Sequence, residues 1–232
     1  MRAWLFALVV VAVVSFGAGH ATAHTGTRAP NVRKPASVAV RRSAPKRHAR
    51  AKVRPRVTMI GDSVADEISY LGSAQAALGR GVQLDLQLAA CRRLVVASCT
   101  VAGVQPTTTL QLVSSLGRSL GPDVVVAVGY NDYELLYPGD VLQVLKALRR
   151  AGVQHVLWLT LRASRHDYVD MNRALREIAS ADPQLTVVDW NAYSRSHPDW
   201  FDSDGVHLTP AGGEAMATLV HERLVAMGIA VS

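Results

Sequence analysis

Short apolar segments alternate five times with longer amphipathic segments, and this alternation constrains the fold more than any other feature of the chain. The short segments are rich in Val, Leu and Ile, and they cover residues 56–60, 82–88, 123–128, 154–160 and 185–189. Because they are apolar on both faces, they are typical of strands that are covered on both sides, as in a parallel sheet. The amphipathic segments predict helices over residues 64–78, 108–120, 139–151, 168–180 and 210–227.

This alternation predicts one α/β domain over residues 56–232, with a five-stranded parallel sheet between two layers of helices. Gly81, Gly121 and Gly152 fall where predicted helices should end, as glycines after a helix commonly do. In doubly wound sheets of this kind, the functional site lies beyond the carboxyl ends of the strands.

The first 23 residues have the three parts of a secretory signal. Arg2 gives a positive start, residues 3–14 form an unbroken apolar run, and a small-residue A-x-A site ends at Ala23. The run is shorter than the roughly 20 residues that a membrane-spanning helix needs. We therefore predict a signal peptide over residues 1–23 and a secreted or cell-envelope-associated protein. An uncleaved N-terminal anchor that extends to Gly19 is the alternative.

A basic segment separates the signal from the domain. Residues 24–56 hold 11 Lys or Arg, no Asp or Glu, and several Pro and Ala. Such a segment repels itself and buries too little apolar surface to fold, so we predict a disordered basic linker over residues 24–55. The linker either contacts anionic polymers or lipid head groups of the cell envelope, or serves as a solvated spacer.

The charge of the domain differs in sign from that of the whole chain. The chain has 25 basic and 18 acidic residues, a net charge of +7. Arg2 and the basic segment hold 12 of the basic residues, so 13 basic residues face 18 acidic ones in residues 57–232, a net charge of about −5. A nucleic-acid-binding domain needs a basic surface of its own, so we expect no nucleic-acid partner.

Two polar sequences follow predicted strands at the same edge of the sheet. Gly61-Asp62-Ser63 follows the first strand, and a hydroxyl there lies at a helix N-terminus, where the helix dipole favours a developing negative charge. Taken alone, these residues also fit a turn in which Ser63 caps the helix. The third strand leads into Gly129 and Asn131. The Asn131 amide can donate to an oxyanion, or it belongs to an ordinary Asn-Asp turn.

Asp204 and His207 lie three residues apart in a loop before the last predicted helix. At this spacing a turn can bring the carboxylate to Nδ1 of the imidazole, which leaves Nε2 free to take a proton from a hydroxyl. The neighbouring acidic residues and histidines match no familiar ligand set, so we expect no metal. Together the three segments supply a nucleophile, an oxyanion donor, a base and its orienter, the groups that acyl transfer requires.

In residue types, order and spacing, these segments resemble the SGNH (GDSL-type) hydrolase family over about residues 57–226. The resemblance implies a flavodoxin-like sheet and the hydrolysis of acyl esters, often acetyl esters, on carbohydrates or lipids, without a metal or organic cofactor. It implies that Ser63 is the nucleophile, His207 the base and Asp204 its orienter. It further implies an oxyanion hole formed by Asn131 and the N–H of Ser63, with motif support from Gly61, Asp62 and Gly129.

The chain departs from the family in its second block, where members offer a glycine whose N–H is a further oxyanion donor. Here the stretch is LQLAACRRL, without glycine. The N–H of Cys91 or of Arg92 can take its place if a disulfide holds the loop. An even pair at short spacing in an exported protein predicts such a disulfide between Cys91 and Cys99. Arg92 and Arg93 either contact an anionic substrate or are solvated.

We therefore predict a secreted, monomeric serine esterase that hydrolyses acyl esters of a glycan or lipid through an acyl-enzyme. One alternative is an O-acyltransferase with the same triad that passes the acyl group to an envelope sugar. The other is a non-catalytic module that keeps the fold and binds the envelope.

Overall fold

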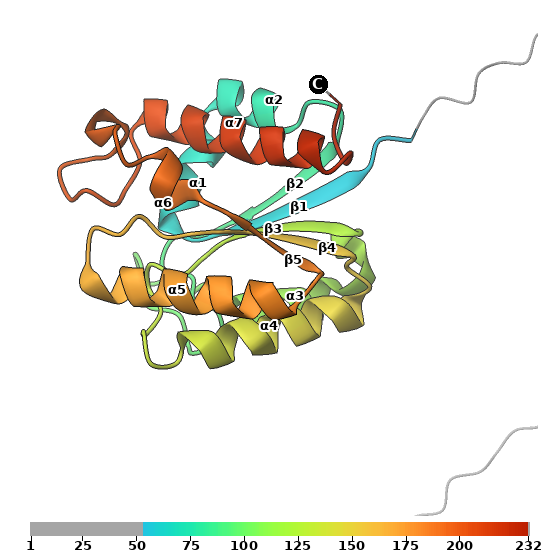
Figure 1. Cartoon of the computed structure of the whole chain (residues 1–232), viewed down its shortest axis with the longest axis horizontal. Coiled ribbons are helices and arrows are strands. Elements are labelled where there is room, and N and C mark those ends of the chain that lie inside the picture. Colours follow the sequence, from blue (N-terminus) through green and yellow to red (C-terminus); the bar gives the residue numbers. More distant parts are fainter. Residues whose placement is uncertain (1–52, 232) are drawn as a thin grey trace, which may run out of the picture. The chain divides into compact units, whose positions relative to one another are not determined.

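The computed structural model describes residues 53–231 (Figure 1). The predicted signal peptide and most of the predicted linker lie outside these residues. Among the helices of residues 53–231, none combines the length and the apolar character needed to cross a bilayer.

Five strands form one parallel sheet in the order β2-β1-β3-β4-β5. They are β1 (Arg56–Gly61), β2 (Gln83–Leu88), β3 (Asp123–Ala127), β4 (His155–Leu159) and β5 (Leu185–Val188). This is the flavodoxin-like order, so the predicted fold class is confirmed. Every residue of the central strand β3 is buried, as its unbroken apolar pattern requires.

Helices cover both faces of the sheet (Figure 1). One face packs against α1 (Ser63–Tyr70), α2 (Gly72–Leu78) and α7 (Pro210–Ala226), and the other against α3 (Thr109–Leu116), α4 (Tyr137–Ala151) and α5 (His166–Ala181). Each face has its own cluster of buried apolar side chains. A short helix α6 (Trp190–Tyr193) and the 3₁₀ turns η1 (Gly117–Leu120) and η2 (Pro198–Trp200) complete the elements.

The predicted single helix over residues 64–78 is wrong, because the chain breaks at Leu71 into α1 and α2. Leu71 has extended backbone angles, φ −114° and ψ 103°. Its side chain packs against α7, where a Cβ on Gly213 would lie 2.8 Å from Leu71 Cδ1. The Gln75 side chain donates to the carbonyls of Ile68 and Ser69 at the end of α1. Tertiary packing therefore overrides a continuous helical pattern.

The register of the sheet brings three chain segments together at the carboxyl edge. Gly61, the last residue of β1, pairs with Leu88 of β2 and with Ala127 of β3. The pairing continues one step past the strands, since Ala89 N donates to Gly61 O at 3.2 Å and Asp62 N donates to Ala127 O at 3.1 Å. The segments that follow β1, β2 and β3 therefore leave the sheet side by side.

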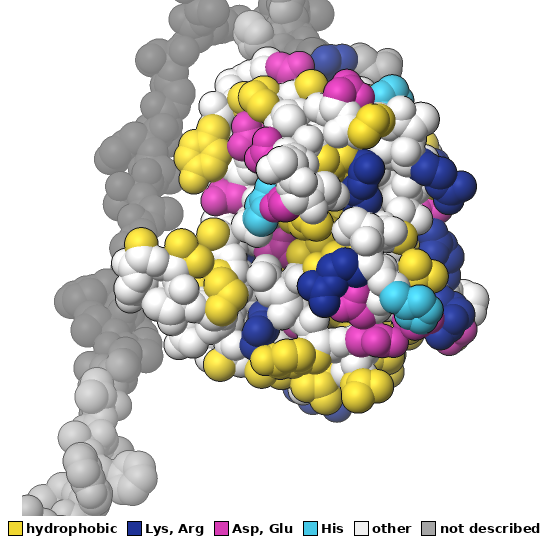
Figure 2. Space-filling model, turned by 90° about the vertical axis from the view of Figure 1, so that its left-hand side faces the viewer, with side chains coloured by type: hydrophobic (Ala, Val, Ile, Leu, Met, Phe, Trp, Pro, Cys, Tyr) yellow, Lys and Arg dark blue, Asp and Glu magenta, His cyan; other side chains and the backbone are white. Residues whose placement is uncertain are grey.

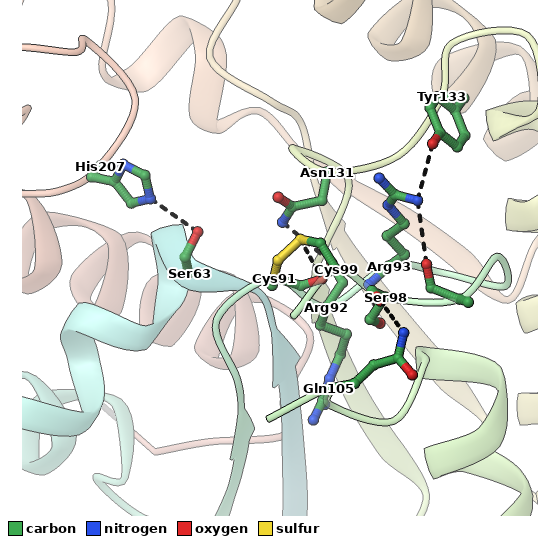
Figure 3. Close-up of a disulfide and its surroundings, with 11 residues drawn as sticks. Ser63, Cys91, Arg92, Arg93, Ser98, Cys99, Gln105, Asn131, Tyr133 and His207 are labelled. Carbon is green, nitrogen blue, oxygen red and sulfur yellow. Dashed lines mark hydrogen bonds between the residues drawn. A yellow bond between two sulfur atoms is a disulfide. The ribbon is translucent and has the colours of Figure 1, made fainter. Parts of the chain in front are cut away.

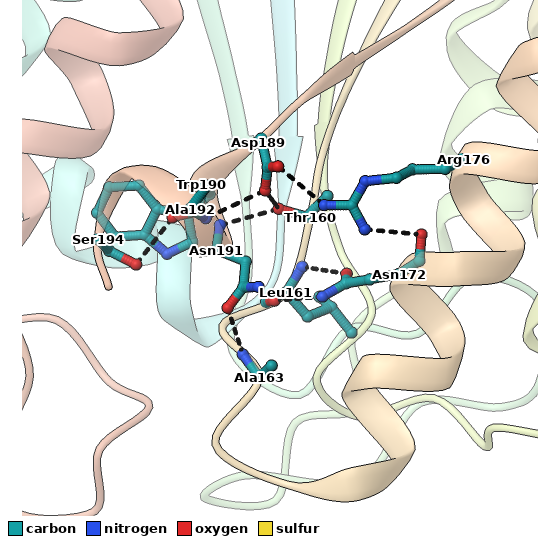
Figure 4. Close-up of polar contacts among 10 residues, drawn as sticks. All are labelled: Thr160, Leu161, Ala163, Asn172, Arg176, Asp189, Trp190, Asn191, Ala192 and Ser194. Atoms are coloured by element: carbon teal, nitrogen blue, oxygen red, sulfur yellow. Dashed lines mark hydrogen bonds and ion pairs between the residues drawn. The ribbon is translucent and has the colours of Figure 1, made fainter. Parts of the chain in front are cut away.

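At the other end of this edge, side chains satisfy the backbone where β4 and β5 stop (Figure 4). The buried amide of Asn172 accepts from Leu161 N at 2.7 Å and donates to Leu161 O at 2.7 Å. It pairs with Leu161 as a neighbouring strand would. Nearby, Thr160 Oγ1 donates to Asp189 at 3.0 Å and accepts from Asn191 N at 2.9 Å.

We expect Asn172→Leu to lower the free energy of unfolding by about 2–4 kcal/mol, because it leaves a buried N–H and a buried C=O of Leu161 unpaired. Urea titration followed by circular dichroism measures this change. The control is Asn191→Ala, which removes the one hydrogen bond that Asn191 Oδ1 accepts from Ala163 N and should cost about 1 kcal/mol or less. Equal losses in the two variants would contradict this account of Asn172.

Candidate active site

Ser63, His207 and Asp204 form a continuous chain of hydrogen bonds. Nε2 of His207 lies 3.0 Å from Ser63 Oγ, and Nδ1 of the same ring lies 2.5 Å from Asp204 Oδ2 (Figure 3 shows the serine–histidine pair). The three side chains that the sequence predicts to act together are therefore brought together. This geometry allows the imidazole to take the serine proton while the carboxylate holds the ring in the required tautomer.

The loop between η2 and α7 gives Asp204 and His207 their positions. An antiparallel bridge between Phe201 and Leu208 closes the loop, and Asp202 N donates to His207 O at 2.8 Å. Asp204 Oδ1 accepts from the N–H groups of Val206 and His207. The hydrogen bond from the His207 ring, followed by those backbone bonds, lowers the pKa of Asp204 to about 2. Asp204 is therefore an anion at neutral pH, as an orienter of imidazole requires.

Asp62 connects the start of the Ser63 helix to the end of β3. Its carboxylate is buried and accepts three backbone N–H groups: Val64 N at 3.1 Å, Gly129 N at 3.1 Å and Tyr130 N at 3.2 Å. Burial raises the pKa of Asp62 to about 6, although the three hydrogen bonds oppose the increase. The carboxylate thus fixes the distance between the segment that carries Ser63 and the one that leads to Asn131.

The two motif glycines are required by space and by conformation. A Cβ on Gly61 would lie 2.6 Å from Ala65 Cβ and 2.7 Å from Leu88 Cδ2. Gly129 has φ +157°, and a Cβ there would lie 2.9 Å from a methyl group of Leu161. Only glycine allows the first helix and the end of β3 to approach this edge so closely.

Asn131 extends from the segment after β3 toward the segment after β2. One hydrogen of its Nδ2 is donated to Arg92 O at 3.3 Å, which leaves the second hydrogen of the amide for another acceptor. Figure 3 shows His207 on one side of Ser63 and Asn131 on the other. A base on one side of the nucleophile and an amide donor on the other is the arrangement that attack on a carbonyl needs. Within residues 53–231, no group of three or more His, Cys, Asp or Glu residues could hold a metal ion.

Solved structures share this fold. The C-terminal catalytic domain of Streptococcus pneumoniae peptidoglycan O-acetyltransferase A (OatA) is 23% identical with a TM-score of 0.57, over 77% of this chain and 97% of that domain. A carbohydrate esterase of family 3 from Talaromyces cellulolyticus is 16% identical with a TM-score of 0.51, over 77% of this chain and 100% of that one. The domain has the SGNH hydrolase fold.

Curated relatives match a shorter part of the chain. The O-acetyltransferase OatA of Staphylococcus aureus is 31% identical over 100 residues, 43% of this chain and 16% of that protein. The peptidoglycan O-acetyltransferase OatA of Listeria monocytogenes is 28% identical over 116 residues, 45% of this chain and 18% of that protein. The chain therefore spans less than a fifth of the length of these relatives. No family profile matches it.

The segment after β2 separates the two candidates for the further oxyanion donor. Arg92 N donates to Ala89 O at 3.3 Å, so this N–H is already engaged. Among the residues that the structure describes, the N–H of Cys91 donates to no acceptor. Within residues 53–231, the N–H of Cys91 is therefore unengaged, whereas the N–H of Arg92 is not.

The loop contains the predicted disulfide between Cys91 and Cys99, with Cα atoms 5.3 Å apart (Figure 3). The solvated interpretation of Arg92 is wrong, since the residue is 5% exposed and its Nη1 donates to Gln87 O at 2.7 Å. Arg93 is half-buried, with its guanidinium 4.5 Å from the centre of the Tyr133 ring and its Nη1 3.3 Å from the hydroxyl of that residue. Two neighbouring arginines thus have different environments.

The sequence alone does not identify Arg162, which packs against Phe201 at the start of the Asp204–His207 loop. Its guanidinium lies 3.6 Å from the centre of the buried Phe201 ring, and its Nη1 donates to Ser194 O at 3.3 Å. Its backbone N–H donates to Tyr130 OH at 2.7 Å. No local pattern could have revealed a cation–π contact between residues this far apart in the sequence.

Asp132 is a second buried carboxyl beside the site, and it makes stability depend on pH. Its Oδ1 accepts from Leu94 N at 2.9 Å, whereas Oδ2 is buried with no partner among the described residues. Burial raises the pKa of Asp132 from 3.8 to about 7, with the bond from Leu94 opposing the increase. The Asp132 carboxyl therefore binds a proton more tightly in the folded state than in the unfolded chain. The free energy of unfolding should fall as the pH rises from 3.8 to about 7.

We expect Asp132→Asn to weaken this pH dependence, because an amide keeps the acceptor for Leu94 N and carries no charge. At pH 8 the variant should be more stable than the wild type by about 1–3 kcal/mol, and at pH 3.5, below the ordinary pKa of the carboxyl, the difference should disappear. Urea titrations at both pH values measure this. Asp62→Asn is the contrast: it sets an NH₂ group against backbone N–H groups and should destabilise at both pH values. A parallel pH dependence in wild type and Asp132→Asn would refute the role of Asp132.

Proposed function

We propose that this domain is a serine O-acyltransferase that carries an acyl group, acetyl in the first instance, on Ser63 and passes it to a hydroxyl of a cell-envelope glycan. The observation that carries the proposal is the hydrogen-bonded chain from Asp204 through His207 to Ser63 Oγ. It is supported by two hydrogen-bond donors on the side of Ser63 away from His207, namely the second Nδ2 hydrogen of Asn131 and the N–H of Cys91. A named relative and a solved neighbour that are peptidoglycan O-acetyltransferases support the acceptor class.

In the first half of the reaction, Ser63 becomes acylated. Nε2 of His207 takes the proton of Ser63 as Oγ attacks the carbonyl carbon of the donor ester. The negative charge moves to the carbonyl oxygen, where the N–H of Ser63 and Nδ2 of Asn131 donate to it. The tetrahedral intermediate then collapses: the ester C–O bond breaks, and the leaving alkoxide takes the proton from Nε2 of His207.

In the second half, the same imidazole activates the acceptor. A glycan hydroxyl gives its proton to Nε2 of His207 and attacks the acyl carbon, and Ser63 leaves with that proton. The side chains of His207 and Asp204 are 48% and 49% exposed, so a bulky acceptor can approach the base directly. Residues 1–23 would export the domain, and the basic linker would keep it near anionic envelope polymers.

Ester hydrolysis is the second candidate function. It uses the same acyl-enzyme with water as the acceptor, and the exposure of His207 admits water as readily as a sugar. The shared fold with a carbohydrate esterase supports it. The two functions differ only in which hydroxyl reaches the acyl group first.

A fluorophosphonate probe tests whether Ser63 is a live nucleophile. We expect one equivalent of probe per chain in the wild type and none in Ser63→Ala, with turnover of p-nitrophenyl acetate lowered about 1,000-fold or more in that variant. Ser69→Ala is the matched control, because Ser69 lies on the same helix and its hydroxyl bonds only to Asp66. Absence of labelling in the folded wild type would favour the non-catalytic envelope-binding module.

Product analysis separates transfer from hydrolysis. With p-nitrophenyl acetate as donor and peptidoglycan oligosaccharides as acceptors, we expect acetylated oligosaccharide by mass spectrometry, formed at the expense of free acetate. The total release of p-nitrophenol should rise with acceptor concentration if deacylation limits turnover. Free acetate as the sole product at every acceptor concentration would favour the esterase.

A further inference from the structure

Cys91 occupies a turn position that normally requires glycine. Arg92 N donates to Ala89 O at 3.3 Å, which makes residues 89–92 a β-turn with Cys91 in third place. Cys91 has φ +68°, and Ala90 is not among the residues with positive φ. A β-turn with positive φ at its third residue and negative φ at its second is a type II turn, and glycine is the usual residue in that third position. A residue with a Cβ is disfavoured there by about 1–2 kcal/mol.

The disulfide gives Cys91 a tether that an isolated turn lacks. It joins Cys91 to Cys99, eight positions along the chain, and so closes a short loop. The far side of the loop is itself anchored, since Ser98 Oγ accepts from Arg93 N at 3.1 Å and Ser98 O accepts from Gln105 Nε2 at 2.5 Å. A cross-link over so short a loop restricts the conformations that residues 89–92 can adopt.

The turn lies against Ser63 on the side away from the base. Its first residue continues the pairing of β2 with β1, because Ala89 N donates to Gly61 O at 3.2 Å. Its last residue accepts the hydrogen bond from Asn131 Nδ2. Figure 3 shows the disulfide beside Asn131, with both on the side of Ser63 opposite His207. The unengaged N–H of Cys91 therefore belongs to a segment that is hydrogen-bonded to both of the segments that carry the donors already assigned to the oxyanion.

We propose that the Cys91–Cys99 disulfide holds the peptide between Ala90 and Cys91 in the orientation that makes the Cys91 N–H a third oxyanion donor. Type I and type II turns differ by a rotation of this middle peptide through about 180°. A Cys91 released from the disulfide can relax to negative φ, and the rotation then turns the Ala90 carbonyl toward the space that the N–H faced. The disulfide is thus a positioning element for catalysis. This inference rests on the acyl transfer proposed above.

Reduction of the wild type is the first test. Dithiothreitol converts the disulfide to two thiols and is itself oxidised to its cyclic disulfide. Because the loss of one oxyanion donor costs about 100- to 1,000-fold in rate, we expect kcat for p-nitrophenyl acetate to fall about 100-fold on reduction, with KM changed by about twofold or less. Equal kcat values for the oxidised and reduced enzyme would overturn the proposal.

Two double variants separate conformation from loss of the cross-link. Cys91→Ala with Cys99→Ser and Cys91→Gly with Cys99→Ser both lack the disulfide, but only glycine adopts φ near +68° without penalty. We expect the alanine variant to lose about 100-fold in kcat and the glycine variant to exceed it by about tenfold or more. Neither should respond to dithiothreitol. Equal kcat values for the two double variants would overturn the proposal.

Titration with the fluorophosphonate probe measures the fraction of each protein that is folded, so that a loss of kcat can be distinguished from unfolding. Each protein, oxidised or reduced, should bind one equivalent at the end of a long incubation, with slower labelling where the donor is lost. A loss of kcat matched by an equal loss of final stoichiometry would mean unfolding, and would overturn the positioning role. An oxidised wild type with neither labelling nor turnover would contradict the acyl transfer itself, and this inference with it.

Discussion

The geometry of the site depends on the buried carboxylate of Asp62. It binds the N–H of Val64 at the start of α1 and those of Gly129 and Tyr130 after β3. Three backbone donors with one acceptor group leave little freedom, so the segments that carry Ser63 and Asn131 cannot move independently. The raised pKa of Asp62 shows that burial outweighs the hydrogen bonds. The protein therefore holds an unfavourable charge at neutral pH in a place where it fixes the carboxyl edge of the sheet.

The two sides of the site differ in how they are held. The donor side belongs to the sheet, because the segments after β1, β2 and β3 are joined by backbone pairing and by the Asn131–Arg92 bond. The base side is a loop, closed by the Phe201–Leu208 bridge and supported by Arg162. A rigid donor side suits a charge that develops at one point in space. A loop that presents a half-exposed imidazole suits acceptors of different size.

The sequence predicts the fold and the triad for one physical reason. Strands buried on both faces are apolar throughout, and a parallel sheet collects the residues after its strands at one edge, so Ser63 and Asn131 were expected to be neighbours. The Asp204–His207 loop follows η2 and not a strand, and its place beside Ser63 was predicted from the residue types that acyl transfer requires. The features that the sequence does not predict depend on contacts between distant segments. The break at Leu71 reflects the space that Gly213 leaves on α7. The burial of Arg92 appears only when the segment after β2 is placed over the sheet edge.

Glycine and a cross-linked cysteine meet the same backbone requirement in different ways. Glycine reaches positive φ without penalty, but it reaches negative φ equally well, so a free glycine turn can present either face of its middle peptide. The Cβ of Cys91 makes the required positive φ unfavourable by itself. The disulfide to Cys99 restricts the other backbone conformations that Cys91 could adopt. This arrangement functions only where disulfides persist, as they do outside the cytosol. The proposed role of the disulfide would therefore link the predicted export signal to the geometry of the site, because a reducing compartment would remove the tether of Cys91.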